Sequence, residues 1–243
     1  MNINNLDILR VTHTHTDCLD VVELYEDGMT QFFPYKWPHL YLANKEFASS
    51  MGSKFHLYDE VESYPTRWLR FLKTIKTEYI FLDHEDMFLY EQCDLNSISR
   101  VISGFIENNG DYLRLIKSDQ CNYSLVEGCQ DLYKLKNSSK WIFSIQPSIW
   151  KRQALIDVLE KNPDVDVWQL EVKSQKVMKN LNIQSYFSHR NGAKRGLHHF
   201  DSEIYPYVAT AIGKGKWNLT EYGEKLFPLF IKFKLDPSVR GWF

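Results

Sequence analysis

Apolar positions along the chain follow two patterns, short dense runs and longer stretches with helical spacing. The short runs are rich in branched and aromatic residues and have the length of β-strands. These runs are residues 6–12, 39–43, 54–58, 79–82, 112–116, 132–135 and 141–145. Each of them is predicted to form a strand.

The longer stretches place apolar residues three or four positions apart, as an amphipathic helix does. The predicted helices cover residues 67–75, 94–106, 148–159 and 167–181. Pro65 precedes the first helix, and Asp94 stands where it can cap the second. Strands that alternate with helices predict an α/β three-layer sandwich with a mainly parallel central sheet. No linker or repeat divides residues 1–243, so we expect a single domain.

Composition and charge narrow the class of protein. Of 243 residues, 44% are hydrophobic and 25% are charged, which is typical of a globular chain with a core. The formal net charge of −2 gives no broad basic field, so we expect no nucleic-acid partner. Aromatic residues make up 15% of the chain and suit both core packing and stacking on sugars or bases.

The cysteines and the N-terminal sequence bear on the compartment. Cys18, Cys93, Cys121 and Cys129 show neither a disulfide framework nor zinc-ligand spacing, which favours free thiols in a reducing compartment. We find no signal peptide and no apolar run of the ~18 residues that a transmembrane segment needs. We therefore expect a cytoplasmic protein, peripheral at a membrane surface if its substrate is membrane-bound.

A cluster of acidic residues follows the strand predicted at residues 79–82, in the sequence TEYIFLDHEDMFLYE. Asp83, Glu85 and Asp86 surround His84 there. In α/β sheets, ligands bind beyond the carboxyl ends of the strands. Closely spaced carboxylates offer hard oxygen ligands for Mg²⁺ or Mn²⁺ shared with substrate phosphates. The alternative is a solvated acidic turn that caps the next helix.

Residues 67–86, RWLRFLKTIKTEYIFLDHED, are similar to the pattern of glycosyltransferases of the A-type (GT-A) fold. In that pattern an Arg opens a helix and a strand ending in an acidic metal motif follows at the same separation. Two positions depart from it, because Glu85 stands where the family has Asp and Thr77 where it has Gly. The resemblance implies that Asp86 is a metal ligand and that Glu85 is a second ligand or holds a diphosphate-bound water.

Downstream stretches extend the resemblance over most of the chain. KWIFSIQPSIWKRQAL resembles the acceptor-side strand and helix, DVWQLEVKSQ resembles a Trp-x-x-Glu segment, and the tail resembles that of a group of bacterial and viral GT-A enzymes. Residues 1–90 would then be the nucleotide-sugar donor half and residues 91–243 the acceptor half and tail.

The resemblance also implies contacts with the donor. Thr12 and His13, after the first strand, would border the base and ribose, and Arg67 would approach the base or the diphosphate. Asp59 would contact the ribose or, alternatively, cap the turn before Pro65. His13 and His15 form an H-x-H pair, but without a third His at helical spacing we favour polar strand-end residues over a zinc site.

Glu171 is the candidate general base. Trp168 lies three positions before it and shares its helix face. An aromatic plane can hold an acceptor sugar while the carboxylate takes the proton from its hydroxyl, with inversion at the anomeric carbon. The alternative is a helix-start Glu beside a core Trp.

A polar, basic segment, SHRNGAKRGLHHFDSE, contains glycines and three further histidines. It could close over a diphosphate as a lid, with His199 completing a metal shell. A charged, solvated loop is the alternative.

Together these features predict a glycosyltransferase in polysaccharide biosynthesis, assisted by Mn²⁺ or Mg²⁺. Its partners would be a nucleotide-diphosphate sugar, with UDP-sugars favoured, and a glycan or lipid-linked acceptor. A metal-dependent nucleotidyltransferase would need a Gly-rich, Lys-bearing loop near the N-terminus, which we do not find. A catalytically silent sugar- or nucleotide-binding module is the third candidate.

Overall fold

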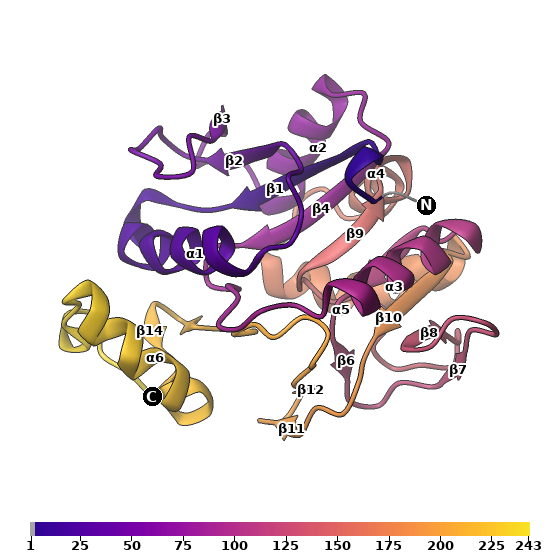
Figure 1. Cartoon of the computed structure of the whole chain (residues 1–243). Helices are drawn as coiled ribbons and strands as arrows, with labels where there is room; N and C mark the ends of the chain where they lie inside the picture. Colours follow the sequence, from indigo (N-terminus) through magenta and orange to yellow (C-terminus); the bar gives the residue numbers. More distant parts are fainter. Residues whose placement is uncertain (1–2) are drawn as a thin grey trace.

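A nine-stranded sheet runs through the middle of the molecule, with helices on both of its faces (Figure 1). The computed structural model describes residues 3–243. The strands are β1 (Ile8–His13), β2 (His39–Ala43), β3 (Lys54–Leu57), β4 (Tyr79–His84), β5 (Tyr112–Arg114), β7 (Tyr123–Leu125), β8 (Leu132–Leu135), β9 (Ser148–Lys151) and β10 (Ser185–Ser188). Their order in the sheet is β3-β2-β1-β4-β9-β5-β10-β8-β7.

Most strands of the sheet point the same way. β3, β2, β1 and β4 pair in parallel. β9 is antiparallel to both of its neighbours, β4 and β5, so β5 runs in the direction of β4. β10 is parallel to β5, and β8 is antiparallel to β10. This arrangement confirms the predicted mainly parallel sheet, and it brings the carboxyl ends of β1, β4 and β5 to one edge.

Six helices form the outer layers. They are α1 (Leu19–Phe32), α2 (Tyr64–Thr74), α3 (Leu95–Glu107), α4 (Arg152–Glu160), α5 (Val167–Asn180) and α6 (Leu219–Phe233) among the residues described. Figure 1 shows α1 and α3 on the near face of the sheet and α2, α4 and α5 on the far face. Side chains alternate along β4 accordingly, because Phe81 joins the core under α1 and α3 whereas Ile80 joins the core under α2, α4 and α5.

Short elements complete the chain. The single-turn helices are η1 (Ile3–Asn5), η2 (Thr16–Cys18) and η3 (Pro237–Val239). Two small sheets are formed by β11 (Lys194–Arg195), β12 (His199–Phe200) and β6 (Lys117–Ser118), and by β13 (Ile212–Gly213) and β14 (Lys216–Trp217). Between residues 3 and 243, no helix is both long and apolar enough to cross a membrane.

Helix starts follow their local sequence. Asp94 accepts a hydrogen bond from the Ser97 N–H at 3.1 Å, which confirms the predicted cap of α3. Ser63 caps α2, and Pro65 lies in its first turn, where its missing N–H costs nothing. α5 begins with a capping box in which Asp166 and Gln169 bind each other's backbone N–H groups.

One region was predicted wrongly. Residues 141–145 form no strand, and Ser148–Lys151, predicted as the start of a helix, is strand β9 between β4 and β5. The apolar side chains of the first segment are buried all the same, because α5 holds its backbone. The Gln175 side chain accepts from the N–H groups of Ile142 and Phe143 at 2.7 and 3.1 Å.

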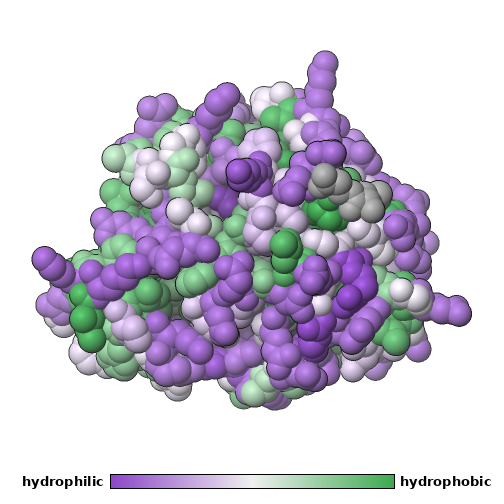
Figure 2. Space-filling view, in the orientation of Figure 1, coloured by the Kyte–Doolittle hydropathy of each residue, from purple (hydrophilic) through white to green (hydrophobic). Residues whose placement is uncertain are grey.

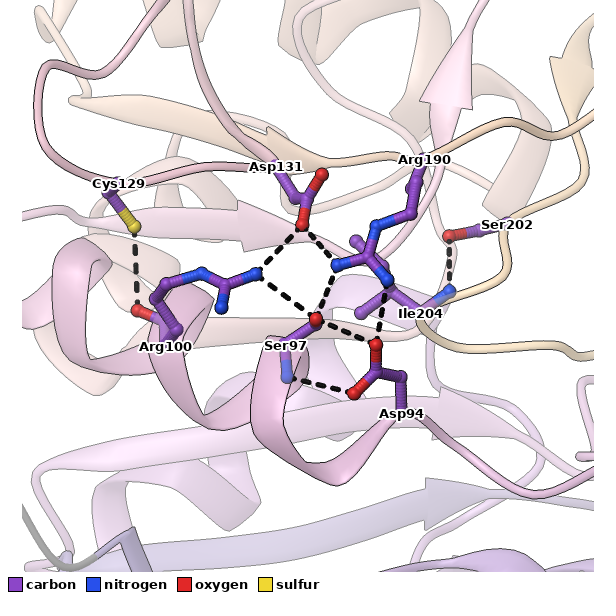
Figure 3. A network of polar contacts seen from close by, with 8 residues as sticks. All are labelled: Asp94, Ser97, Arg100, Cys129, Asp131, Arg190, Ser202 and Ile204. Carbon is purple, nitrogen blue, oxygen red and sulfur yellow. Dashed lines mark hydrogen bonds and ion pairs between the residues drawn. The ribbon is translucent and has the colours of Figure 1, made fainter.

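A network of ion pairs ties the segment after β10 to the start of α3 (Figure 3). Arg190 binds Asp94 at 2.7 Å and Asp131 at 2.5 Å, and Arg100 binds the same Asp131 oxygen at 3.0 Å. The Asp131 side chain is only 5% exposed, so its charge depends on these two guanidinium groups.

We expect Arg190→Met to lower the free energy of unfolding by about 2 kcal/mol, since it leaves the buried Asp131 with one partner. Urea denaturation measures the change. Lys194→Met is the matched control, because its pair with Asp119 is solvent-exposed and should contribute less than about 1 kcal/mol. Equal effects of both substitutions would contradict a special role for the buried network.

Candidate active site

A cavity of about 740 Å³ opens at the carboxyl edge of β1 and β4. The ends of these strands, the starts of α2 and α5, and residues from the segments before β9 and around β13 line it. The cavity therefore joins parts of the chain that are more than a hundred residues apart. It lies where parallel α/β sheets bind their ligands.

The cavity is strongly acidic. Among the described residues that line it, Arg67 is the one Lys or Arg side chain. The acidic lining residues are Glu62, Glu85, Asp86, Asp164, Asp166 and Glu171. Arg67 itself is held in place, because it donates to the backbone carbonyls of Glu60 and Glu62 and lies 4.1 Å above the Tyr58 ring.

Glu85 and Asp86 emerge from the end of β4 without a basic partner within ion-pair distance in the part of the chain described. Burial raises the pKa of both carboxyls, and the neighbouring Asp86 charge raises the pKa of Glu85 further. The Cys18 thiol hydrogen-bonds Glu85, and the Ile212 N–H hydrogen-bonds Asp86, which stabilises their charged forms only in part. Near pH 7 the two carboxyls therefore share less than two negative charges, and a nearby cation would favour their ionised forms.

A divalent cation would fit Glu85 and Asp86 only if a bound substrate or water supplied its remaining ligands. Within residues 3–243, no group of three or more His, Cys, Asp or Glu side chains is arranged to hold a metal. Mg²⁺ and Mn²⁺ sites that use one or two carboxylates take their remaining ligands from substrate phosphates and water. Glu85 and Asp86 match that type of site.

Asp83 has a different environment from its neighbours. It is fully buried, and it accepts hydrogen bonds from the Thr12 hydroxyl at 2.6 Å and the Tyr25 hydroxyl at 2.7 Å. Burial raises the pKa of Asp83 to about 7, although the charge of Arg10 opposes this. Thr12 thus lies beneath the cavity, bound to Asp83, and does not line it.

Two neutral histidines form another wall of the cavity. The His13 ring is parallel to the Tyr58 ring at 5.1 Å, and its buried Nε2 has no hydrogen-bond partner. His84 Nε2 is 2.8 Å from the Tyr64 hydroxyl. Burial lowers the pKa of His13 well below its usual value and that of His84 to about 4. Both imidazoles are therefore uncharged near pH 7.

Glu171 and Trp168 lie across the cavity on α5. One Glu171 oxygen accepts the Ile145 N–H at 2.6 Å, which fixes the side chain, and burial raises the pKa of the carboxyl. The Trp168 side chain is 63% exposed, so it is not a core residue. A half-buried carboxylate beside an exposed aromatic plane suits a proton acceptor next to a bound sugar.

Other predicted site residues lie elsewhere. Asp59 is exposed, caps its own turn through the Val61 N–H at 3.1 Å, and does not line the cavity. His199 lies on β12, with Nε2 2.6 Å from the Tyr222 hydroxyl, and is also outside the cavity lining. The structure brings together His13, Arg67, Glu85, Asp86, Trp168 and Glu171.

The basic segment predicted as a lid is engaged in contacts of its own. Arg190 is bound in the network of Figure 3, Lys194 binds Asp119, and Arg195 binds Asp201. None of the described residues 188–202 lines the cavity. In this structure the segment is a fixed part of the protein surface.

Some lining residues carried no clear signal in the sequence. His84 lies at the end of a strand and Tyr64 at the start of a helix, so only their positions beside these elements could have indicated that they line the cavity. Gln146 and Thr210 reach the cavity only through long-range contacts, since Gln146 donates to the Ala209 carbonyl at 3.2 Å. No local pattern identifies such residues.

Comparisons with known proteins address the fold. No family model and no curated protein sequence matches the chain. The solved structure of S. aureus TarS has a TM-score of 0.50 and 11% identity, covering 93% of this chain and 39% of that one. The chain therefore spans well under half of that TarS structure. This likeness confirms the predicted GT-A-like fold of nucleotide-diphospho-sugar transferases.

Two further structures are similar at slightly lower scores. One is CMP:2-keto-3-deoxy-manno-octonic acid synthetase complexed with CTP, with a TM-score of 0.49 and 10% identity over 74% of this chain and 88% of that one. The other is UDP-glucose pyrophosphorylase complexed with UDP-glucose, with a TM-score of 0.49 and 8% identity over 77% and 91%.

The acidic pair gives a pH dependence with a definite sign. Because the folded pKa values of Glu85 and Asp86 are raised, ionising them costs folding free energy as pH rises above the ordinary carboxyl pKa of about 4. We expect Glu85→Gln/Asp86→Asn to raise the unfolding free energy by about 1–2 kcal/mol at pH 8 and by almost nothing at pH 4. Thermal melting of both proteins, without divalent cations, across this range measures it. The same gain at both pH values would refute this origin.

Proposed function

We propose that this protein is a metal-assisted glycosyltransferase that moves a sugar from a nucleotide-diphosphate donor to a hydroxyl of an acceptor. A UDP-sugar is the favoured donor, and a glycan or lipid-linked saccharide is the favoured acceptor. One observation carries the proposal. A single cavity on a GT-A-like sheet has the carboxylate pair Glu85 and Asp86 on one wall and Glu171 with Trp168 on another.

The donor side follows from charge. A nucleotide diphosphate brings negative charge into a cavity that already has six acidic residues and one Arg. Binding there requires a cation, and Asp86 with Glu85 would hold Mn²⁺ or Mg²⁺. The ion supplies charge neutralisation for the diphosphate leaving group. Arg67 adds a fixed cation, and neutral His13 offers its unpartnered Nε2 to the nucleoside.

The acceptor side follows from Glu171. Its position is fixed by the Ile145 N–H, which leaves the second oxygen for a substrate hydroxyl. As the acceptor oxygen bonds to the anomeric carbon, the bond from that carbon to the diphosphate oxygen breaks and Glu171 takes the hydroxyl proton. Trp168 would pack against the acceptor ring. A single displacement of this kind inverts the anomeric centre.

The competing functions fit the site less well. A nucleotidyltransferase needs basic and glycine residues after β1 to hold a triphosphate, but residues 14–18 are Thr-His-Thr-Asp-Cys, of which the last three form η2. A silent binding module would need no fixed, half-buried carboxylate at the acceptor side. Glu171 therefore favours the enzyme.

We expect Asp86→Asn to weaken Mn²⁺-dependent binding of UDP by at least ~100-fold while the fold is kept, since Asn preserves the contact with the Ile212 N–H but removes the charge. Titration calorimetry with UDP, in MnCl₂ or in EDTA, measures the effect. Asp59→Asn, an exposed carboxylate outside the cavity, should bind as the parent does. Equal affinity of the parent protein in MnCl₂ and in EDTA would rule out the metal.

We expect Glu171→Gln to lower kcat by ~100-fold or more with UDP affinity little changed. Gln still accepts the Ile145 N–H, so the side chain keeps its place but loses its basicity. Release of UDP from a panel of UDP-sugars, with mixed glycans as acceptors, measures turnover. Glu107→Gln, an exposed residue at the end of α3, is the control. Normal turnover in Glu171→Gln would assign this carboxylate to structure alone.

A further inference from the structure

A second pocket, of about 450 Å³, lies beyond the end of β5. Residues 117–123 line it together with Ser138, Lys140 and Phe200. One wall is the pairing of β6 with β12, in which Lys117 is opposite Phe200. The segment that carries β12 therefore helps to build this pocket, and Figure 2 shows a mainly hydrophilic surface in the region of β11 and β12.

The charge of this pocket is opposite to that of the acidic cavity. Lys117 and Lys140 line it, and neither has a carboxylate within ion-pair distance among the residues described. Asp119, the acidic residue of the lining, is bound by Lys194 at 2.9 Å. Two lysines thus line a pocket whose one carboxylate is already paired.

Lys117 is held in position by aromatic rings. Its Nζ lies 4.6 Å from the centre of the Phe200 ring and 5.4 Å from that of Tyr123. Cation–π contacts of this kind fix an ammonium group without consuming its charge. These contacts place a fixed positive charge at the wall of the pocket. The pocket is arranged for an anion.

The pocket and the acidic cavity are neighbours along one sheet edge. Arg114, at the end of β5, donates to Cys121 Sγ of the pocket at 3.6 Å and to Ser144 Oγ at 3.1 Å. Ile145 and Gln146, next along the chain, line the cavity that contains Glu171. One buried arginine thus separates the two sites.

We propose that this pocket binds an anionic group, a phosphate or a carboxylate, on the acceptor glycan at a unit away from the reacting hydroxyl. The assignment to the acceptor rests on the proposed function, whereas anion binding by Lys117 and Lys140 does not. The acidic cavity takes the reacting unit, and the basic pocket selects acceptors that carry negative charge. Such a division gives specificity through charge complementarity.

Binding is tested with the whole protein and three probes, inorganic phosphate, trigalacturonate and the neutral maltotriose. In ¹H–¹⁵N spectra we expect shifts at residues 117–123 and 138–140 with phosphate or trigalacturonate and none with maltotriose. The stronger of the two anions identifies the preferred group. Affinity should fall as salt is added. Absence of shifts with both anions, or equal shifts with maltotriose, overturns the proposal.

Substitutions make the test specific. Lys117→Met/Lys140→Met keeps much of the aliphatic length, removes both charges, and should weaken anion binding by about 10-fold or more. Lys76→Met, an exposed lysine outside both sites, should have no effect. The double variant should bind UDP with MnCl₂ as the parent does, so a failure of this proposal is distinct from a failure of the proposed function. Unaltered anion affinity in the double variant refutes the role of the two lysines.

Discussion

The buried carboxyl of Asp83 determines how the acidic end of β4 is presented. It joins three elements, because Thr12 comes from β1, Tyr25 from α1 and Asp83 itself from β4. A carboxyl at this depth requires hydrogen-bond donors, and both hydroxyls supply them. These hydrogen bonds hold the end of β4 against β1 and α1. The next residues, Glu85 and Asp86, therefore leave the sheet toward the cavity. The placement of Glu85 and Asp86 thus depends on Asp83, whose own oxygens accept hydrogen bonds from the two hydroxyls.

Charge is separated along the sheet edge. The cavity beyond β4 concentrates carboxylates, while the pocket beyond β5 has two lysines that lack acidic partners among residues 3–243. Both arise from the same topology, since parallel strands end at the same edge and each loop can carry a different chemistry. A donor bound together with a cation would therefore occupy the acidic cavity, and an anionic group of the acceptor would occupy the basic pocket at the same edge of the sheet.

Local patterns in the sequence predicted much of this arrangement. The strand before Asp83, the helix before it and the cap at Asp94 follow from short-range spacing, and the acidic pair follows from the strand end. The strand at Ser148–Lys151 was missed because its short, mostly buried run directly precedes α4 and has the pattern of the start of that helix. His199 was placed in the site by position along the chain, whereas its contact is with Tyr222. A contact between residues this far apart produces no periodic pattern in the sequence from which it could be predicted.

The basic segment after β10 is held away from the acidic cavity by its own ion pairs. Moving Arg190 to a diphosphate would break its contacts with Asp94 and Asp131, and the second of these carboxylates is almost completely buried. Leaving Asp131 with Arg100 as its one partner costs about 2 kcal/mol, which a new phosphate contact would have to offset. Arg190, Lys194 and Arg195 are thus engaged in contacts of their own, so a metal ion held by Glu85 and Asp86 would have to balance the charge of a diphosphate instead.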